Sequence, residues 1–189
     1  MDKSVVAIGY ATYGIIESNP TGVAYSEVKW LASESEGCRS FKATPEGELK
    51  EIYADGKVVR ALMGNNGYSI ALTTIAALDD IETDWYGKTK TTDGGILETN
   101  KQTKAREFAL LEVREDEYGK YHTTVYYRCY PSQRLAKESK TSEGSFDPIF
   151  PEHSLLSRPR SDGNVCYTKT FNTLTEAKVA KIFEATAGA

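Results

Sequence analysis

The sequence contains few of the residues that build metal centres and catalytic dyads. Only two histidines occur, His122 and His153, and neither has a second imidazole at the spacing of metal ligands. No glycine-rich phosphate loop and no nucleophile-elbow motif is present. We therefore expect no metal, no cofactor and no catalytic residues, and the sequence favours a structural or binding protein over an enzyme.

Cysteine is also sparse, and long apolar runs are missing. Cys38, Cys129 and Cys166 are an odd, scattered set without a C-x-x-C pair, which is typical of reduced thiols in a cytosolic product. No segment reaches the length needed to span a bilayer. The apolar run near the N-terminus is interrupted by Gly9 and Tyr10, too soon for a signal peptide. We expect no membrane anchor.

Strong charge of either sign is absent as well. The net charge of -4 is modest and no Lys/Arg-rich run stands out, so tight nucleic-acid binding through phosphate neutralisation is disfavoured. A hydrophobic content of 40% and a charged content of 26% over 189 residues indicate one globular domain with a good core. The twelve tyrosines suit strands and large protein contacts.

Alternating apolar and polar residues over most of the chain predict strands. The clearest hairpin joins 107–115 to 121–130, with large side chains on both faces of both strands. Such strands are covered on both sides, here by a second sheet or by a neighbouring subunit. One side of the return strand is predicted to hold Tyr121, Thr123, Val125, Tyr127 and Cys129.

Turn and helix signals lie between the other predicted strands. Thr44–Gly47, Asn65–Gly67 and Asp55-Gly56 are predicted reversals. Apolar residues at helical spacing between Thr74 and Gly87 predict an amphipathic flanking helix, and a capping-box pattern opens a C-terminal helix over 173–187. The expected fold is mainly β with minor α. Two packed antiparallel sheets form a sandwich that carries both helices, in a single domain over 1–189.

The segment 17–36 breaks the strand pattern and is interpreted as a loop or arm. It is polar but carries large apolar side chains, and such side chains on loops often anchor partners. The alternative is that Trp30 folds back on its own domain. Together with the first strand, this segment supplies the predicted inter-subunit contact residues, namely Tyr25, Val28, Trp30, Leu31, Val5, Val6 and Ile8.

A series of short motifs runs in a fixed order through 49–171. They are Tyr53-Ala54-Asp55, Asn65-Asn66-Gly67-Tyr68, Asp79-Asp80, Asp84, Gly87, Gly94–Glu98, Lys104, Glu107–Leu111, His122, Tyr126-Tyr127 and Cys129. Their order and spacing resemble the major tail protein, or tail tube protein, of the long non-contractile tails of siphophages. The N-terminal segment and the C-terminal helix match less well.

This resemblance implies a structural virion protein of two packed β-sheets with a flanking helix. Six copies would close into a ring, and stacked rings would form a hollow tail tube through which DNA passes without specific binding. The implied partners are further copies of the chain and other tail proteins, such as the tape measure and the tail terminator. The tube would be assembled in the bacterial host cytoplasm and become part of the virion tail. In this scheme, 17–36 and the N-terminal strand would join one ring to the next.

Two other functions remain open. A β-sandwich carbohydrate-binding or adhesin module would present an aromatic platform around Tyr126, Tyr127 and Tyr130. A small hydrolase would use His122 or His153 with nearby acids in a deep pocket, where burial and charge shift a carboxylate or imidazole pKa.

Overall fold

The computed structural model describes residues 4–15, 23–25, 28–31, 37–76, 79–100, 106–137 and 149–183. This part of the chain is mainly β with minor α, as predicted. The elements are β1 (Ser4–Ile15), β2 (Val23–Tyr25), β3 (Lys29–Trp30), β4 (Cys38–Glu46), β5 (Leu49–Ala54), β6 (Lys57–Met63), β7 (Gly67–Thr74), α2 (Asp79–Asp84), β8 (Thr89–Lys90), β9 (Ile96–Leu97), β10 (Phe108–Glu115), β11 (Tyr121–Pro131), β12 (Glu152–Ser157), β13 (Cys166–Phe171) and α3 (Glu176–Phe183).

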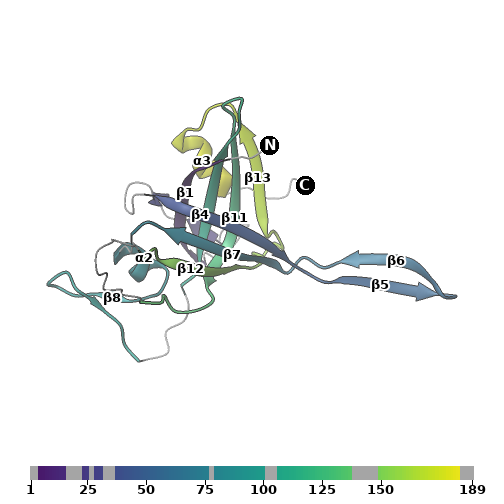
Figure 1. Cartoon of the computed structure of the whole chain (residues 1–189), viewed down its shortest axis with the longest axis horizontal. Helices are drawn as coiled ribbons and strands as arrows, with labels where there is room; N and C mark the ends of the chain where they lie inside the picture. Colours follow the sequence, from purple (N-terminus) through teal and green to yellow (C-terminus); the bar gives the residue numbers. More distant parts are fainter. Residues whose placement is uncertain are drawn as a thin grey trace, which may run out of the picture.

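The main sheet is antiparallel and bends over on itself. Its order is β2-β1-β10-β11-β12-β7-β4, with β13 also on β11 and β3 also on β1. Along one edge of β11, residues 121–126 pair with β13 and residues 129–131 pair with β12. Between these two stretches Arg128 has a φ of 41°. The change of partner lets β12, β7 and β4 lie across β1 and β10, which gives a sandwich-like arrangement (Figure 1).

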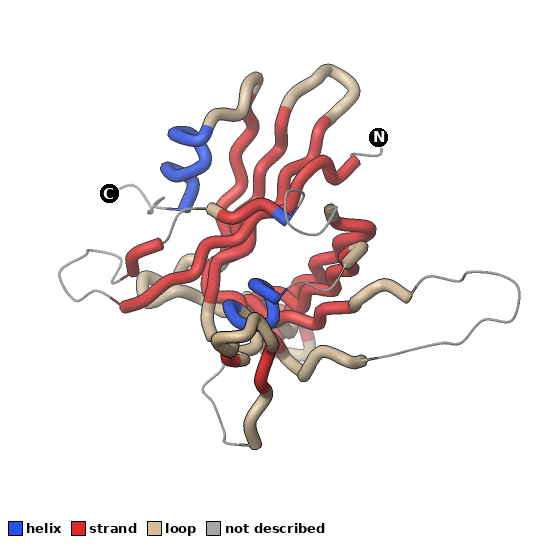
Figure 2. The backbone as a smooth tube through the Cα atoms, turned by 90° about the vertical axis from the view of Figure 1, so that its left-hand side faces the viewer, coloured by secondary structure: helices blue, strands red, loops and turns tan. Residues whose placement is uncertain are grey.

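Two apolar clusters lie on the two faces of β10 and β11. The interlayer core, between the strands of the bent sheet and beside α2, consists of Ile8, Leu31, Ile70, Leu72, Ile81, Trp85, Phe108, Leu110, Tyr126, Cys129 and Leu155. The helix-side core consists of Ala109, Leu111, Val113, Val125, Tyr127, Val179, Ile182 and Phe183. The central hairpin is thus covered on both faces, as its side chains predict, by another layer of the sheet and by α3 (Figure 2).

One residue of this hairpin lies on the face opposite to the predicted one. Cys129 is buried with Tyr126 in the interlayer core, and not with Tyr127 on the helix side. Strict alternation would place Tyr127 and Cys129 together. The left-handed conformation of Arg128 and the register shift opposite it, between Phe108 and Leu110, add a bulge that turns the next side chain over.

The flanking helix is shorter than predicted. Thr74 still belongs to β7, its backbone N–H donates to the Pro151 carbonyl, and its hydroxyl donates to the Ala76 carbonyl. These bonds keep Thr74 in the sheet, the chain bends at Ile75 and Ala76, and Ile75 is exposed. The predicted end is confirmed, because Gly87 has a φ of 68°.

The C-terminal helix is confirmed over Glu176–Phe183. Its predicted apolar stripe, Val179 with Ile182 and Phe183, is buried against β10 and β11. Residues 184–187 of the predicted helix lie outside the described residues.

Candidate functional site

Strands β5 and β6 form a two-stranded ribbon that extends away from the rest of the molecule (Figure 1). We call this ribbon, residues 49–63, the arm. Its tip reverses at Asp55-Gly56 as predicted, with φ values of 51° and 74°, the two positive angles that a tight hairpin turn requires. Strands of this length span about 20 Å, and every residue of both is exposed.

The register gives the arm two chemically different faces. Leu49 pairs with Met63, and Tyr53 pairs with Val58 beyond a bulge. Directly paired residues share a face, so these four form an apolar face, on which the Tyr53 hydroxyl also donates to the Glu51 carboxylate. The opposite, basic face carries Lys50 beside Leu62 and Ile52 beside Arg60.

The arm exposes seven large apolar side chains. Its exposed large apolar side chains are Leu49, Ile52, Tyr53, Val58, Val59, Leu62 and Met63. Tyr53 is 62% exposed and Met63 is 81% exposed. A two-stranded hairpin alone is marginally stable, and contiguous exposed apolar side chains mark interaction surfaces. The arm therefore has the composition of an interface.

The root of the arm shows why two predicted reversals are wrong. Thr44–Gly47 and Asn65–Gly67 do not turn the chain back. They face each other, and the ribbon runs through them from β4 and β7 into β5 and β6. Backbone bonds connect them, from Asn66 N–H to the Glu46 carbonyl at 2.8 Å and from Gly64 N–H to the Glu48 carbonyl at 3.0 Å. The residues that signal a reversal instead mark a narrow point where the two strands of the ribbon cross.

Glycine is required at this crossing. A Cβ on Gly47 would lie 1.9 Å from the Gly64 carbonyl oxygen, and one on Gly67, whose φ is 117°, would lie 1.9 Å from the Ser157 oxygen. Arg158 follows β12 and clamps the crossing to the body. Its Nη1 donates to the Glu46 carboxylate and, at 3.0 Å, to the Asn66 carbonyl. Both strands of the arm are thereby tied to the sandwich.

Several predicted contact residues are covered by their own chain. Ile8 and Leu31 are fully buried in the interlayer core, so their side chains offer no surface to another subunit. Val28 and Trp30 are half-buried against the helix-side core, and a Cβ on Gly9 would lie 2.9 Å from Val28. Trp30 thus folds back on its own domain, and deletion of 19–35 would also remove part of both cores.

The remaining predicted contacts are less fully described. The backbones of Val5 and Val6 lie in β1 and that of Tyr25 in β2, whereas their side chains lie outside the described residues. Within 17–36, residues 17–22, 26–27 and 32–36 also lie outside them.

Sequence reasoning found the arm's strands but not their exposure. The sequence signal that could have indicated this exposure is the pattern of Lys57–Met63, in which apolar and basic residues fall on both faces of the strand. A strand that packs on a core through one face shows a cleaner alternation.

His153 is a buried structural residue. Its Nδ1 lies 2.9 Å from the Tyr86 hydroxyl and its Nε2 lies 3.2 Å from the Thr74 hydroxyl. The Trp85 ring meets the imidazole edge-on, with centroids 5.3 Å apart. Burial lowers the pKa of His153 to about 4, although the charge of Glu82 acts in the opposite direction.

This pKa predicts a loss of stability on mild acidification. An unfolded chain takes up a proton at His153 near a pKa of about 6.5, whereas the folded chain does so only near 4. The free energy of unfolding should therefore be highest above about pH 6.5 and fall by about 3 kcal/mol down to pH 4. Urea unfolding as a function of pH tests this. His153→Gln should lose that slope, and an unchanged slope in the variant would contradict the assignment.

His122 is half-buried and holds a turn. Its Nε2 is 2.8 Å from Asp116 Oδ2, and its Nδ1 is 2.9 Å from the hydroxyl of Thr170, its direct partner on β13. The imidazole bond and backbone N–H groups hold the pKa of Asp116 down at about 2. Asp116 also accepts from the backbone of Tyr118 and Lys120. The arrangement closes the turn between β10 and β11.

The residues named for the two alternative functions are also placed by the structure. His122 contacts Asp116 and the pKa of His153 is lowered, as a hydrolase would need, but neither histidine lines the pocket beside α2. Tyr126 and Tyr127 are buried, so the predicted aromatic platform for glycans is not formed by them. Within the described part of the chain, no group of three His, Cys, Asp or Glu side chains is placed to hold a metal ion. All three cysteines are free thiols, and burial raises the pKa of Cys38 to about 11 and that of Cys129 to about 12.

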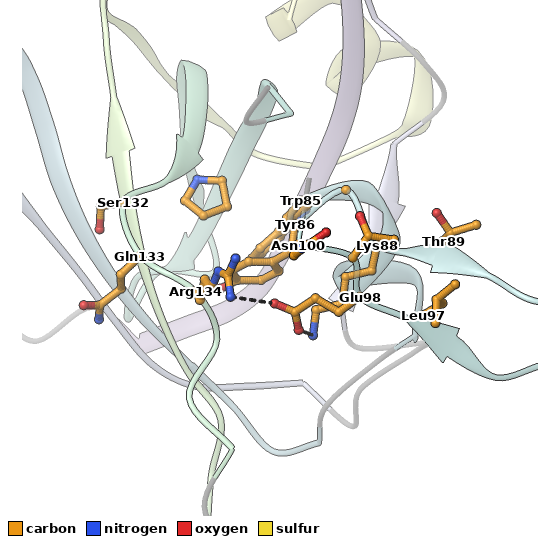
Figure 3. A pocket seen from close by; sticks show the side chains of 13 residues that line it. Trp85, Tyr86, Lys88, Thr89, Leu97, Glu98, Asn100, Ser132, Gln133 and Arg134 are labelled. Carbon is orange, nitrogen blue, oxygen red and sulfur yellow. Dashed lines mark ion pairs between the residues drawn. The ribbon is translucent and has the colours of Figure 1, made fainter. Parts of the chain in front are cut away.

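A pocket of about 510 Å³ opens beside α2. We call it the flank pocket. Trp85 and Tyr86 line it together with Leu97 (Figure 3). Glu98 bridges two cations there, with Lys88 at 3.3 Å and Arg134 at 3.4 Å. Its lining also includes Gly87, Thr89, Thr99, Asn100, Pro131, Ser132 and Gln133.

Comparison of the chain with protein-family models gives no match, and neither does comparison with curated protein sequences. Among the helices that the structure describes, none combines the length and apolar character needed to cross a membrane.

Proposed function

We propose that this chain is a self-assembling structural protein, a tail tube protein of the siphophage class. In this proposal six copies form a ring, and the rings stack into a hollow tube that conducts DNA. The observation that supports it best is the arm, a fully exposed two-stranded ribbon with apolar side chains on both faces. A second copy of the chain would supply the cover that the arm lacks.

The energetic scale fits assembly through many modest contacts. Full burial of one aliphatic side chain or Met contributes about 1.5–3 kcal/mol. Association of two molecules costs about 4–15 kcal/mol in lost freedom and ordering. Partial burial of seven side chains contributes a sum of the same order as that cost, so a single pair is marginally stable. Ring closure and stacking repeat the contact, and the linkage between contacts multiplies their effect.

The placement of the arm also fits a ring. When the arm of one copy meets the body of the next, the two surfaces differ, and such head-to-tail contacts generate closed rings or open filaments. The Arg158 clamp would hold every arm at one angle to its sandwich. A constant angle is what a closed ring of identical subunits requires.

The other components of the proposal come from the resemblance of the sequence. They are a location in the virion tail, assembly in the host cytoplasm, and tape measure and tail terminator proteins as partners. The net charge of -4 would suit a lumen through which DNA slides without being held.

Negative-stain electron microscopy of the purified chain over a concentration series, with native mass measurement in parallel, tests the proposal. We expect rings or hollow tubes above a threshold concentration and masses that are multiples of a hexamer. A chain that stays monomeric up to about 1 mM, where even a weak contact of about 4 kcal/mol is half-populated, would contradict it.

A further inference from the structure

We infer that the flank pocket receives the tip of a neighbouring copy's arm. The tip comprises residues 52–59, and the pocket lies beside α2. The inference rests on the proposed function, since it names the surface that the arm would meet, and it supplies a contact between unlike surfaces of identical chains.

The two surfaces lie at opposite ends of the molecule. In Figure 1 the arm extends to one side, while α2 and β8 lie at the other. Figure 2 looks onto the α2 end, and the arm points away from the viewer. An arm cannot reach the pocket of its own chain in this arrangement. It can reach that of a copy placed next to it in the same orientation.

The tip and the pocket both present apolar side chains. The accessible apolar lining is the half-buried Tyr86 and Leu97, which is 52% exposed, whereas Trp85 lies buried behind them in the interlayer core. The tip offers Tyr53 and Val58 side by side on its apolar face. A volume of about 510 Å³ is within the range of pockets that enclose small ligands.

The charges also match. The pocket lining holds Lys88, Arg134 and Glu98, and Glu98 contacts both cations. Lys88 is also paired with Glu82, which is not part of the lining, so the ion-pair cluster is neutral. The tip carries one acid, Asp55, and one base, Lys57, both exposed. The tip therefore brings no net charge to the contact.

The exposed charged side chains of the pocket and the tip can form ion pairs across the contact. Arg134 is 80% exposed at the pocket and can approach Asp55, and the 41% exposed Glu98 can approach Lys57. Charge complementarity of this kind selects register and orientation more than it adds affinity.

A pair of complementary variants tests the inference. Tyr53→Asp disables the tip and leaves the pocket intact, whereas Leu97→Asp disables the pocket and leaves the tip intact. Each variant alone should remain monomeric, with association weakened about 100-fold or more. Mixed in equal amounts, they should form a 1:1 dimer and nothing larger, because only one functional tip and one functional pocket can meet. Analytical ultracentrifugation reads out all three samples.

Tyr118→Asp is the matched control, because Tyr118 is an exposed tyrosine, 74% accessible, on the turn between β10 and β11. It should assemble as the unmodified chain does. Circular dichroism and thermal melting confirm that each variant is folded.

Different negative results would contradict the pocket inference and the proposed role of the arm in assembly. If Tyr53→Asp prevents assembly and Leu97→Asp does not, the arm has another receptor and the pocket inference is wrong. The same holds if both prevent assembly but the mixture forms no dimer. If Tyr53→Asp assembles as the unmodified chain does, or the unmodified chain does not associate, the role proposed for the arm in assembly is itself overturned.

Discussion

Aspartate at both Tyr53 and Met63 is expected to abolish ring and tube formation while leaving the monomer folded. Both side chains lie on the apolar face of the arm and are among its most exposed apolar groups. The double change removes about 3–6 kcal/mol of potential apolar burial per contact. It also places two carboxylates in an interface that would have to desolvate them. Each 1.4 kcal/mol is about tenfold in affinity, so association should weaken by about three orders of magnitude or more.

The folded monomer should be almost unaffected, because substitutions of exposed residues usually change stability by about 0.5 kcal/mol or less. Thermal melting and size-exclusion chromatography with light scattering measure the two properties separately. Tyr118→Asp serves again as the matched control. Tubes of normal length from the double variant would show that the arm does not build the assembly.

Phe108→Ala is expected to have the largest effect on stability. Phe108 is fully buried in the interlayer core and stacks on Trp85, with ring centroids 4.5 Å apart and an interplanar angle of 8°. Truncation of a buried Phe costs about 3–5 kcal/mol, from lost burial and from the cavity left behind. A domain of this size unfolds with about 5–15 kcal/mol in total. The midpoint of thermal unfolding should fall by about 6–20 °C.

Leu62→Ala on the arm is the control for that measurement. Leu62 is exposed, so its truncation should leave the unfolding midpoint within about 2 °C of the unmodified chain. A shift of similar size in both variants would mean that the arm packs on the body in solution. A shift of less than about 2 °C for Phe108→Ala would contradict the tight packing of Phe108 in the interlayer core.

The central hairpin shows what local pattern determines. In β10, Phe108 and Leu110 face the interlayer core and Ala109 and Leu111 face α3, as alternation along the strand predicts. The stripe of α3 and the turn at Asp55-Gly56 were equally predictable. In each case the signal depends on residues next to one another in the chain.

The features that define the candidate site depend instead on contacts between segments that are distant in the sequence. The glycines at the root of the arm carry a reversal signal, yet they form a crossing because β4 and β7 continue into the arm as one ribbon. Cys129 lies on the interlayer side because β11 exchanges β13 for β12 at Arg128. These outcomes depend on pairing between distant segments.

The sequence by itself determined the mainly β class, the two faces of β10 and the tip of the arm, because backbone periodicity and turn chemistry are local. Only the tertiary structure decided that Leu31 is buried, that Met63 is exposed, and that a pocket lies at the end opposite the arm. An apolar residue on a strand is buried or exposed according to which distant segment covers it. That choice is made by the fold as a whole.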